Sequence, residues 1–143
     1  MLIKKLLKQE LLPALKLVWN VFLEFEAPDY SEQGINTFKN YIADEAMMFE
    51  LEFYGAFKDD ELLGIIAMRN KNHLTMLFTK KEHHKKGVAK LLFNHILQIT
   101  DEKIFTVNSS PYAVEIYHKL GFTDTDNEKE INGIRFTSMQ YRV

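Results

Sequence analysis

The chain has 143 residues, of which 46% are hydrophobic and 27% are charged, and this size and balance predict a single soluble globular domain over residues 1–143. Its net charge of −2 gives no overall attraction to nucleic acid or an anionic membrane, so neither is expected as a partner. The absence of cysteine excludes disulfides, thiol nucleophiles and cysteine-ligated metals. We expect a cytoplasmic protein, because no apolar run is long enough to span a membrane and Met1–Lys5 lacks the layout of a secretory leader.

The N-terminal third favours a short strand followed by a pair of helices. Residues 1–7 suit a strand, although a helix remains an alternative there. Apolar residues at helical spacing predict a helix over residues 10–25, which Pro28 must end. Ser31 is a suitable N-cap for a second helix that runs to about Ala43. The connecting segment, residues 24–30, carries three carboxylates and is called the acidic elbow below.

The middle of the chain changes to the pattern of strands. Three short apolar runs cover residues 53–57, 62–68 and 73–78, and polar, turn-forming segments separate them. Such a pattern predicts an antiparallel meander. Its third strand leads into a basic loop and then into a helix over about residues 88–99.

The C-terminal third alternates strands and helices. A strand is expected over residues 103–107, and Ser110–Pro111 marks the start of a helix that ends at Gly121. Phe122 opens another strand, and Asn132–Gly133 indicates a tight hairpin. In the last strand the apolar residues change phase, which predicts a bulge near Thr137–Ser138.

This element order predicts an α/β (α+β) fold with a mixed, mostly antiparallel, twisted sheet of about six or seven strands and about four helices. The strand-helix-strand unit over residues 73–107 requires one parallel pair within that sheet. Ligands in open sheets favour the carboxyl ends of strands where the topology changes. We therefore expect a site near Thr79 and Asn108.

The basic loop before the third predicted helix is a candidate phosphate site. Backbone N–H groups at the start of a helix have no partner within it, and the helix dipole is positive there. Gly87 and Ala89 leave room for an anion to approach the backbone. Five lysines add positive charge or, alternatively, form only a solvated surface: Lys80, Lys81, Lys85, Lys86 and Lys90.

Two motifs resemble those of the GNAT superfamily of acetyl-CoA-dependent N-acyltransferases. The family's phosphate motif, Q/R-x-x-G-x-G/A, corresponds to His84–Ala89, with histidine at the first position. Its second signature, N-x-x-A-x-x-x-Y-x-x-x-G-F, corresponds to Ser110–Phe122, with serine in place of asparagine. The expected order of elements over nearly the whole chain is also similar to that family.

The resemblance implies that acetyl-CoA is the cosubstrate and that no metal takes part. In this family the pantetheine arm enters a gap between two splayed parallel strands, which corresponds here to a gap between residues 77–79 and Asn108. The residues implied in cofactor binding are Leu77, Phe78, Thr79, His84, Lys85, Lys86, Gly87, Val88, Ala89, Lys90, Asn108, Ser110, Ala113 and Tyr117.

The resemblance also implies direct attack of a primary amine on the thioester, with Tyr117 as the general acid. The alternative for Tyr117 is a packed aromatic side chain on the inner face of a helix. His73 is the first candidate for the general base, because it alternates with Thr75 and Leu77 along a strand, so that its side chain can face the cleft, and because its ordinary pKa suits neutral pH. It can equally be a solvated residue at a strand end. Glu24 and Glu26 are rivals for that role. His83 and His84 make a poor metal site, because no carboxylate accompanies them at a suitable spacing.

The acidic elbow is the best indication of the acceptor. In this family the corresponding segment commonly walls the acceptor pocket, so Glu24, Glu26 and Tyr30 are candidate substrate-binding residues. Carboxylates there would attract a small cationic amine, such as a polyamine or an amino sugar. The alternatives are a solvated turn, an acceptor on a protein, and a non-catalytic acyl-CoA-binding module on the same fold. A homodimer is also consistent with the resemblance.

Overall fold

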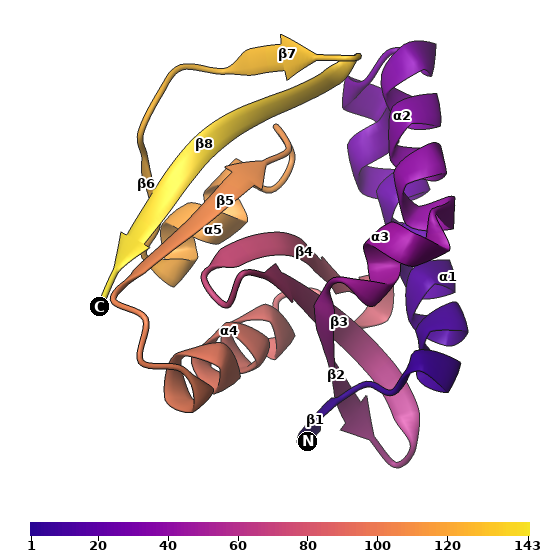
Figure 1. Cartoon of the computed structure of the whole chain (residues 1–143), viewed down its shortest axis with the longest axis vertical. Coiled ribbons are helices and arrows are strands. Elements are labelled where there is room, and N and C mark those ends of the chain that lie inside the picture. Colours follow the sequence, from indigo (N-terminus) through magenta and orange to yellow (C-terminus); the bar gives the residue numbers. More distant parts are fainter.

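A mixed sheet of eight strands runs through the computed structural model, which describes residues 1–143 (Figure 1). The strands lie in the order β1-β2-β3-β4-β5-β8-β6, and β7 pairs with β8. Every pair is antiparallel except β4 and β5. The fold class expected from the sequence is confirmed. The strands are β1 (Leu2–Lys5), β2 (Glu52–Lys58), β3 (Glu61–Arg69), β4 (His73–Thr79), β5 (Ile104–Ser109), β6 (Thr123–Asp124), β7 (Lys129–Ile131) and β8 (Ile134–Arg142).

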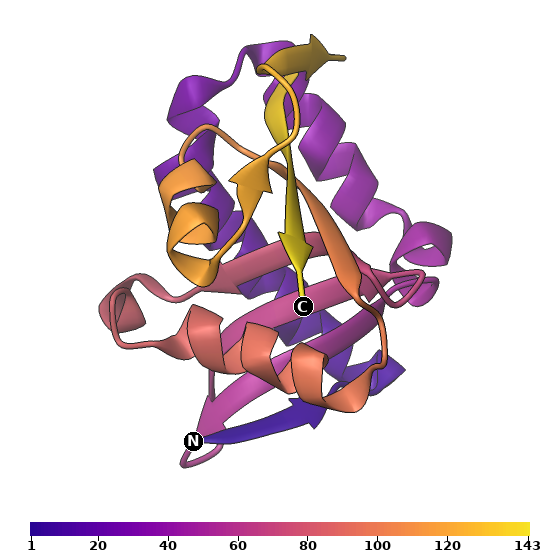
Figure 2. The same cartoon turned by 90° about the vertical axis from the view of Figure 1, so that its left-hand side faces the viewer.

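Helices cover both faces of the sheet and produce two apolar cores (Figures 1 and 2). Alternate residues of β3 enter opposite cores: Ile65 packs towards α1 and Ile66 towards α4. None of the helices combines the length and the apolar character needed to cross a membrane. The helices are α1 (Leu11–Val21), α2 (Glu32–Ala43), α3 (Glu45–Phe49), α4 (Val88–Ile99) and α5 (Val114–Leu120).

Most local signals in the sequence produced the elements that they predict. The Ser31 hydroxyl accepts a hydrogen bond from the Gly34 N–H at 3.2 Å and caps α2. Gly121 ends α5 in the left-handed conformation. Asn132 and Gly133 both have positive φ angles, 53° and 79°, as a two-residue hairpin of the primed type requires.

Four local features differ from the expectation. The first predicted helix changes at Phe22 into a π-helical turn over Phe22–Glu26, and a 3-10 turn over Ala27–Asp29 follows. Helix α3 was not expected, and α5 begins at Val114 after a non-helical turn. Two short strands, β6 and β7, replace the single strand expected at Phe122.

The bulge predicted in β8 is wrong. The strand pairs with β7 through its first residues and then with β5, without a register shift, from Thr137 to Arg142. The apolar side chains change face because the strand changes neighbours: Ile134 lines a cavity beside α2, whereas Met139 enters the core below α4 and α5. The phase change in the sequence therefore results from a change of packing partner and not from the extra residue of a bulge.

The parallel pair expected from the topology is present but short. Only His73 and Leu74 of β4 pair with Thr106 and Val107 of β5, after which the two strands diverge. A bulge at Thr75 lies at this point, because Leu74 pairs with Met68 whereas Met76 pairs with the adjacent Ala67. The strands thus form the splayed arrangement that the family resemblance implies.

The hairpin of β7 and β8 docks against α2. The Gly133 carbonyl lies so close to Gly34 that a Cβ built on Gly34 would be 2.1 Å from it. The Thr37 hydroxyl donates to the Asn132 carbonyl at 2.8 Å. This contact joins the last strand to the second helix across the diverging strands.

Candidate active site

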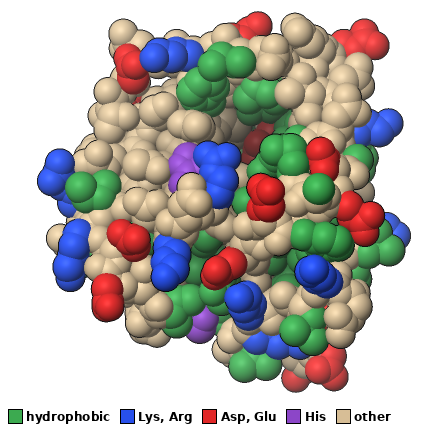
Figure 3. Space-filling model, viewed as in Figure 1, with side chains coloured by type: hydrophobic (Ala, Val, Ile, Leu, Met, Phe, Trp, Pro, Cys, Tyr) green, Lys and Arg blue, Asp and Glu red, His purple; other side chains and the backbone are tan.

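A cavity of about 280 Å³ lies where β4 and β5 diverge. Figure 3 shows a hollow on the face seen in Figure 1, between β8 and α2, with acidic side-chain atoms visible inside it. The cavity brings together a large part of the predicted site. The predicted residues that line it are Leu77, Phe78, Asn108, Ser110, Ala113 and Tyr117 from the cofactor set, and Glu26 and Tyr30 from the acceptor set.

The π-helical turn after α1 positions the carboxylate of the cavity. A π turn widens the helix, and such turns are frequent at functional sites. Here it places Glu26 in the cavity lining together with Phe22, one turn earlier. Burial raises the pKa of the Glu26 carboxyl to about 7; a hydrogen bond with the Ser110 side chain opposes this rise, and the charge of Asp29 adds to it. Glu26 therefore titrates in the range in which a general base works.

Tyr117 reaches the cavity from α5. Its ring is buried and packs edge-on against Phe122, with ring centroids 5.5 Å apart. Tyr117 is one of the residues that line the cavity. Burial, followed by the negative charge of Glu26, raises the pKa of the phenol, so the proton stays on Tyr117 at neutral pH. The packed ring and the available proton are thus both present.

The loop between β4 and α4, residues 80–87, is rich in unpaired backbone donors. It projects at the left of Figure 2. Five N–H groups over residues 85–90, at the end of this loop and in the first turn of α4, make no hydrogen bond with the protein. Gly87 has a φ of +80°, and a Cβ built on it would have no protein atom within 4 Å. An anion therefore has open access to this backbone. The five unpaired N–H groups belong to Lys85, Gly87, Val88, Ala89 and Lys90.

The lysines of this loop divide into two groups. Lys81 forms an ion pair with Glu24 at 2.8 Å, and Lys80 with Glu61 at 3.4 Å. The side chains of the other three lysines have no acidic partner: Lys85, Lys86 and Lys90. The backbone N–H groups of Lys85 and Lys90 are also unpaired, and Lys86 lies between two residues with unpaired N–H groups. The free cations and the free amides thus lie in the same short segment.

The His84 side chain connects the loop to the end of β4. Its Nε2 lies 2.8 Å from the Thr79 carbonyl oxygen, and because a carbonyl only accepts, this nitrogen carries the proton. Its ring packs against Phe25, with centroids 4.7 Å apart, and Phe25 in turn packs against Tyr112 at 5.2 Å. This stack joins the basic loop, the acidic elbow and the segment before α5.

The edge of β4 that faces the gap carries backbone groups that no neighbouring strand pairs, although the Thr79 carbonyl accepts the hydrogen bond from His84. The Lys80 N–H donates to the Leu63 carbonyl, and antiparallel alternation therefore directs the polar groups of Phe78 towards β3 and those of Leu77 and Thr79 towards β5. Beyond Leu74, β5 no longer pairs with this edge. The gap accordingly has main-chain groups that can bind an extended arm.

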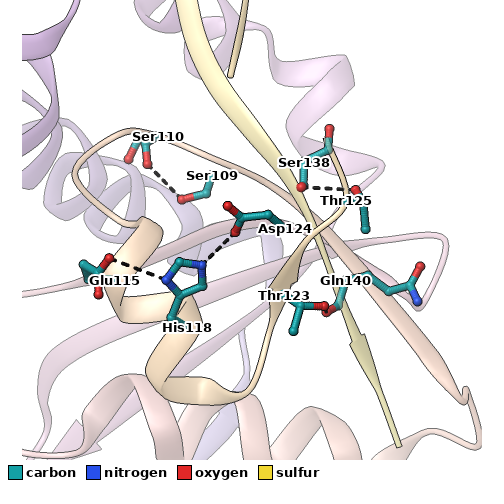
Figure 4. Close-up of polar contacts among 9 residues, drawn as sticks. All are labelled: Ser109, Ser110, Glu115, His118, Thr123, Asp124, Thr125, Ser138 and Gln140. Atoms are coloured by element: carbon teal, nitrogen blue, oxygen red, sulfur yellow. Dashed lines mark hydrogen bonds and ion pairs between the residues drawn. The ribbon is translucent and has the colours of Figure 1, made fainter. Parts of the chain in front are cut away.

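The segment between β5 and α5 is fixed by polar contacts, and Figure 4 shows the one between Ser109 and Ser110. The Ser109 hydroxyl donates to the Ser110 carbonyl at 2.8 Å, and the Ser110 hydroxyl accepts from the Ala113 N–H at 3.3 Å. On the outer face of α5, His118 lies 2.7 Å from an Asp124 oxygen and ties the helix to β6. The position of Tyr117 on α5 is supported from both sides.

Two residues that the sequence suggested for catalysis or acceptor binding lie outside the cavity. His73 is at the start of β4, where its Nδ1 is 2.8 Å from the Thr106 hydroxyl, and burial lowers its pKa. Its alternation with Leu77 fails because the bulge at Thr75 reverses the phase of the strand. Glu24 is directed to Lys81 instead of the cavity.

Thr75 is a cavity residue that sequence reasoning missed. Its hydroxyl is buried, lines the cavity and has no hydrogen-bond partner. It occupies the bulge of β4, and no pattern in the sequence marks that bulge. Unpaired buried hydroxyls are uncommon in folded proteins, which makes this one a candidate ligand contact.

Comparison with known proteins agrees with this geometry. A family model described as the acetyltransferase (GNAT) domain matches residues 26–143. No curated protein matches the sequence significantly. Among solved structures, a GCN5-related N-acetyltransferase from Rhodopseudomonas palustris superposes with a TM-score of 0.86 at 20% identity, covering 99% of this chain and 95% of its own.

Two further structures have the same fold. The PaiA N-acetyltransferase from Thermoplasma acidophilum, in complex with coenzyme A, gives a TM-score of 0.81 at 20% identity, with 99% and 98% of the two chains covered. Tetrahymena GCN5 gives 0.70 at 16% identity, with 99% and 96% covered. On the family match and this shared fold, the chain belongs to the GNAT superfamily of acetyltransferases, whose members transfer acyl groups from acetyl-CoA.

Proposed function

We propose that the protein is an N-acetyltransferase that transfers the acetyl group of acetyl-CoA to a primary amine by direct attack. The observation that carries this proposal is the cavity between β4 and β5, which holds a carboxylate that titrates near neutral pH and a protonated phenol. These two groups, Glu26 and Tyr117, supply the two proton transfers that aminolysis of a thioester needs.

The residues of the basic loop fit the pyrophosphate of coenzyme A. Five free N–H groups converge at the start of α4, and Gly87 leaves the approach to them open. The unpaired Lys85, Lys86 and Lys90 supply counter-charge. The main-chain groups of Leu77 and the N–H of Thr79 face the gap that would receive the pantetheine arm, beside Asn108 and Ala113.

The chemistry divides between the two titratable side chains. Bound acetyl-CoA supplies an activated acyl carbonyl on a thioester. Glu26 accepts the proton that the amine nitrogen loses as its bond to the acyl carbon forms. Tyr117 donates its proton to the sulfur as the carbon–sulfur bond breaks. Proton exchange between the two groups, directly or through water, then restores the starting state of the site.

Glu26 is a better candidate base than His73 for a geometric reason. A base must lie within hydrogen-bond reach of the attacking nitrogen, or one water away from it. Glu26 lines the same cavity as Tyr117, and its charge influences the pKa of that phenol. His73 is held against Thr106 in the part of the sheet where β4 and β5 still pair.

Release of free thiol from acetyl-CoA tests the proposal. Purified protein with acetyl-CoA and a panel of primary amines should release CoA thiol and form the N-acetylated amine in equal amounts. Binding of acetyl-CoA without thiol release, with every amine tried, would instead support a non-catalytic acyl-CoA-binding module. Absence of acetyl-CoA binding at about millimolar ligand, seen by calorimetry, would refute both functions.

A further inference from the structure

We propose that the acceptor is a small monoamine with an apolar body, such as an aromatic ring or a branched alkyl group. This inference rests on the proposed N-acetyltransferase function and adds the class of acceptor. It is carried by the lining of the cavity between β4 and β5, namely its aromatic wall, its single charge and its pairing of polar groups.

Aromatic rings form one wall of the cavity. Phe22, from the π turn, stacks on Phe38 of α2 with centroids 4.2 Å apart and lies 5.6 Å from Tyr30. Phe38 also contacts Phe78 of β4 at 6.2 Å. The rings come from three separate elements and face one space, so a hydrophobic group placed there would be surrounded by aromatic carbon.

Only one charged side chain lines the cavity. Of the 15 lining residues, Glu26 alone is ionisable as an acid or base near neutral pH, and no Lys or Arg is among them. The Glu26 carboxylate can therefore pair with one ammonium group of the acceptor before that group loses its proton. A second ammonium in the cavity would lie against apolar side chains, and a carboxylate in the acceptor would face Glu26 without a cation.

The acidic elbow does not supply a second negative charge to the cavity. Its other glutamate, Glu24, forms an ion pair with Lys81 at 2.8 Å. Asp29 is exposed, and its carbonyl accepts a hydrogen bond from Arg135 at 3.1 Å. The composition of the acidic elbow suggested a polyamine. Inside the cavity, however, the ammonium groups of a polyamine would have only one carboxylate, that of Glu26, as a partner.

Two hydroxyl groups of the cavity lining are already paired within the protein. The single hydrogen of the Thr37 hydroxyl is shared by the Gln33 and Asn132 carbonyls, at 2.9 and 2.8 Å, and the Tyr30 hydroxyl donates to the Arg135 carbonyl at 3.3 Å. Thr75, whose buried hydroxyl has no partner, lines the cavity together with Tyr117. An amino sugar would find few partners for its own hydroxyls. The pantetheine end of acetyl-CoA shares this cavity, whose volume of about 280 Å³ is already just below the roughly 300–1,000 Å³ of pockets for drug-sized ligands, so the acceptor is small.

The test compares kcat/KM for 2-phenylethylamine, isopentylamine, methylamine, spermidine and glucosamine, each corrected to the concentration of its neutral amine. The two apolar monoamines should exceed spermidine and glucosamine by about tenfold or more, as one well-buried aromatic or branched group provides. Preference for spermidine or glucosamine would overturn the inference. Loss of thiol release with all five amines would instead refute the function on which it rests.

Two variants locate the preference in the cavity. Phe38→Leu, which keeps an apolar core residue, should lower kcat/KM for 2-phenylethylamine about tenfold while changing that for methylamine little. Phe49→Leu is the matched control, since Phe49 is 41% exposed on α3 outside the cavity, and it should leave both values unchanged. An equal loss for both amines in Phe38→Leu, or no loss, would show that the aromatic wall does not bind the acceptor.

Discussion

Replacement of Glu26 by glutamine should reduce catalysis and increase stability at the same time. The pKa of the buried carboxyl is raised from an ordinary 4.5 to about 7. The folded state therefore binds more protons than the unfolded state between these two values, and stability falls as pH rises through that window. At about 1.36 kcal/mol for each pKa unit, the ionised carboxylate costs at most about 3 kcal/mol above pH 7.

Glutamine removes this cost because it is neutral at every pH and its amide oxygen can still accept a hydrogen bond from Ser110. At about pH 8 the variant should gain up to about 3 kcal/mol in the free energy of unfolding, and the gain should vanish near pH 4, where both proteins are neutral at this position. Urea unfolding of the two proteins at both pH values measures the difference.

The same substitution removes the base. Turnover by thiol release should fall roughly 10²- to 10⁴-fold, the usual contribution of general acid–base catalysis. In the wild type, kcat/KM, calculated from the concentration of the neutral amine, should fall about tenfold for each pH unit below pH 7 as Glu26 becomes protonated. A variant that is less stable at pH 8, or one that keeps the full rate, would refute the assignment of Glu26 as a buried base.

Three further substitutions test other parts of the site. Tyr117→Phe should lower kcat by about 10²-fold or more while leaving acetyl-CoA affinity in calorimetry unchanged, and an unchanged kcat would remove Tyr117 from the reaction. Gly87→Ala should weaken acetyl-CoA binding at least about tenfold yet cost only about 1–2 kcal/mol of stability, because φ is +80° but the space is open; full retention of affinity would contradict the phosphate site. Gly133→Ala has nearly the same φ, +79°, but its Cβ would lie 2.4 Å from the Gly34 nitrogen, so it should lose about 1–3 kcal/mol more than Gly87→Ala in urea unfolding, and equal losses would mean that the hairpin contact with α2 adjusts freely.

The sequence predicts the elements whose signals are local. The meander, the cap at Ser31, the hairpin at Asn132–Gly133 and the glycine that ends α5 all depend on residues within a few positions of one another. The parallel pairing of β4 with β5 follows from the crossover rule once those elements are placed. These signals were sufficient for the fold class and for the place of the cavity along the chain.

Features that depend on tertiary packing were not predicted. The helical pattern of residues 10–25 continues through Phe22 without a break, so nothing marks the π turn that directs Glu26 into the cavity. The bulge at Thr75 adds one residue to β4 and reverses the phase by which His73 had been assigned to the cleft. In β8 the apolar phase does change, but the cause is a change of neighbouring strand and helix.

Mass spectrometry of a single reaction tests whether the acetyl group passes directly from acetyl-CoA to an amine. Purified protein is mixed with acetyl-CoA and 2-phenylethylamine, and the amine product, the CoA thiol and the intact protein are measured together; a parallel sample omits the amine. Direct transfer should give equal amounts of thiol and N-acetylated amine in the complete reaction, with an unmodified protein in both samples. An acetylated protein that forms without the amine and disappears when it is added would contradict direct attack, and no product with any amine would contradict the proposed function.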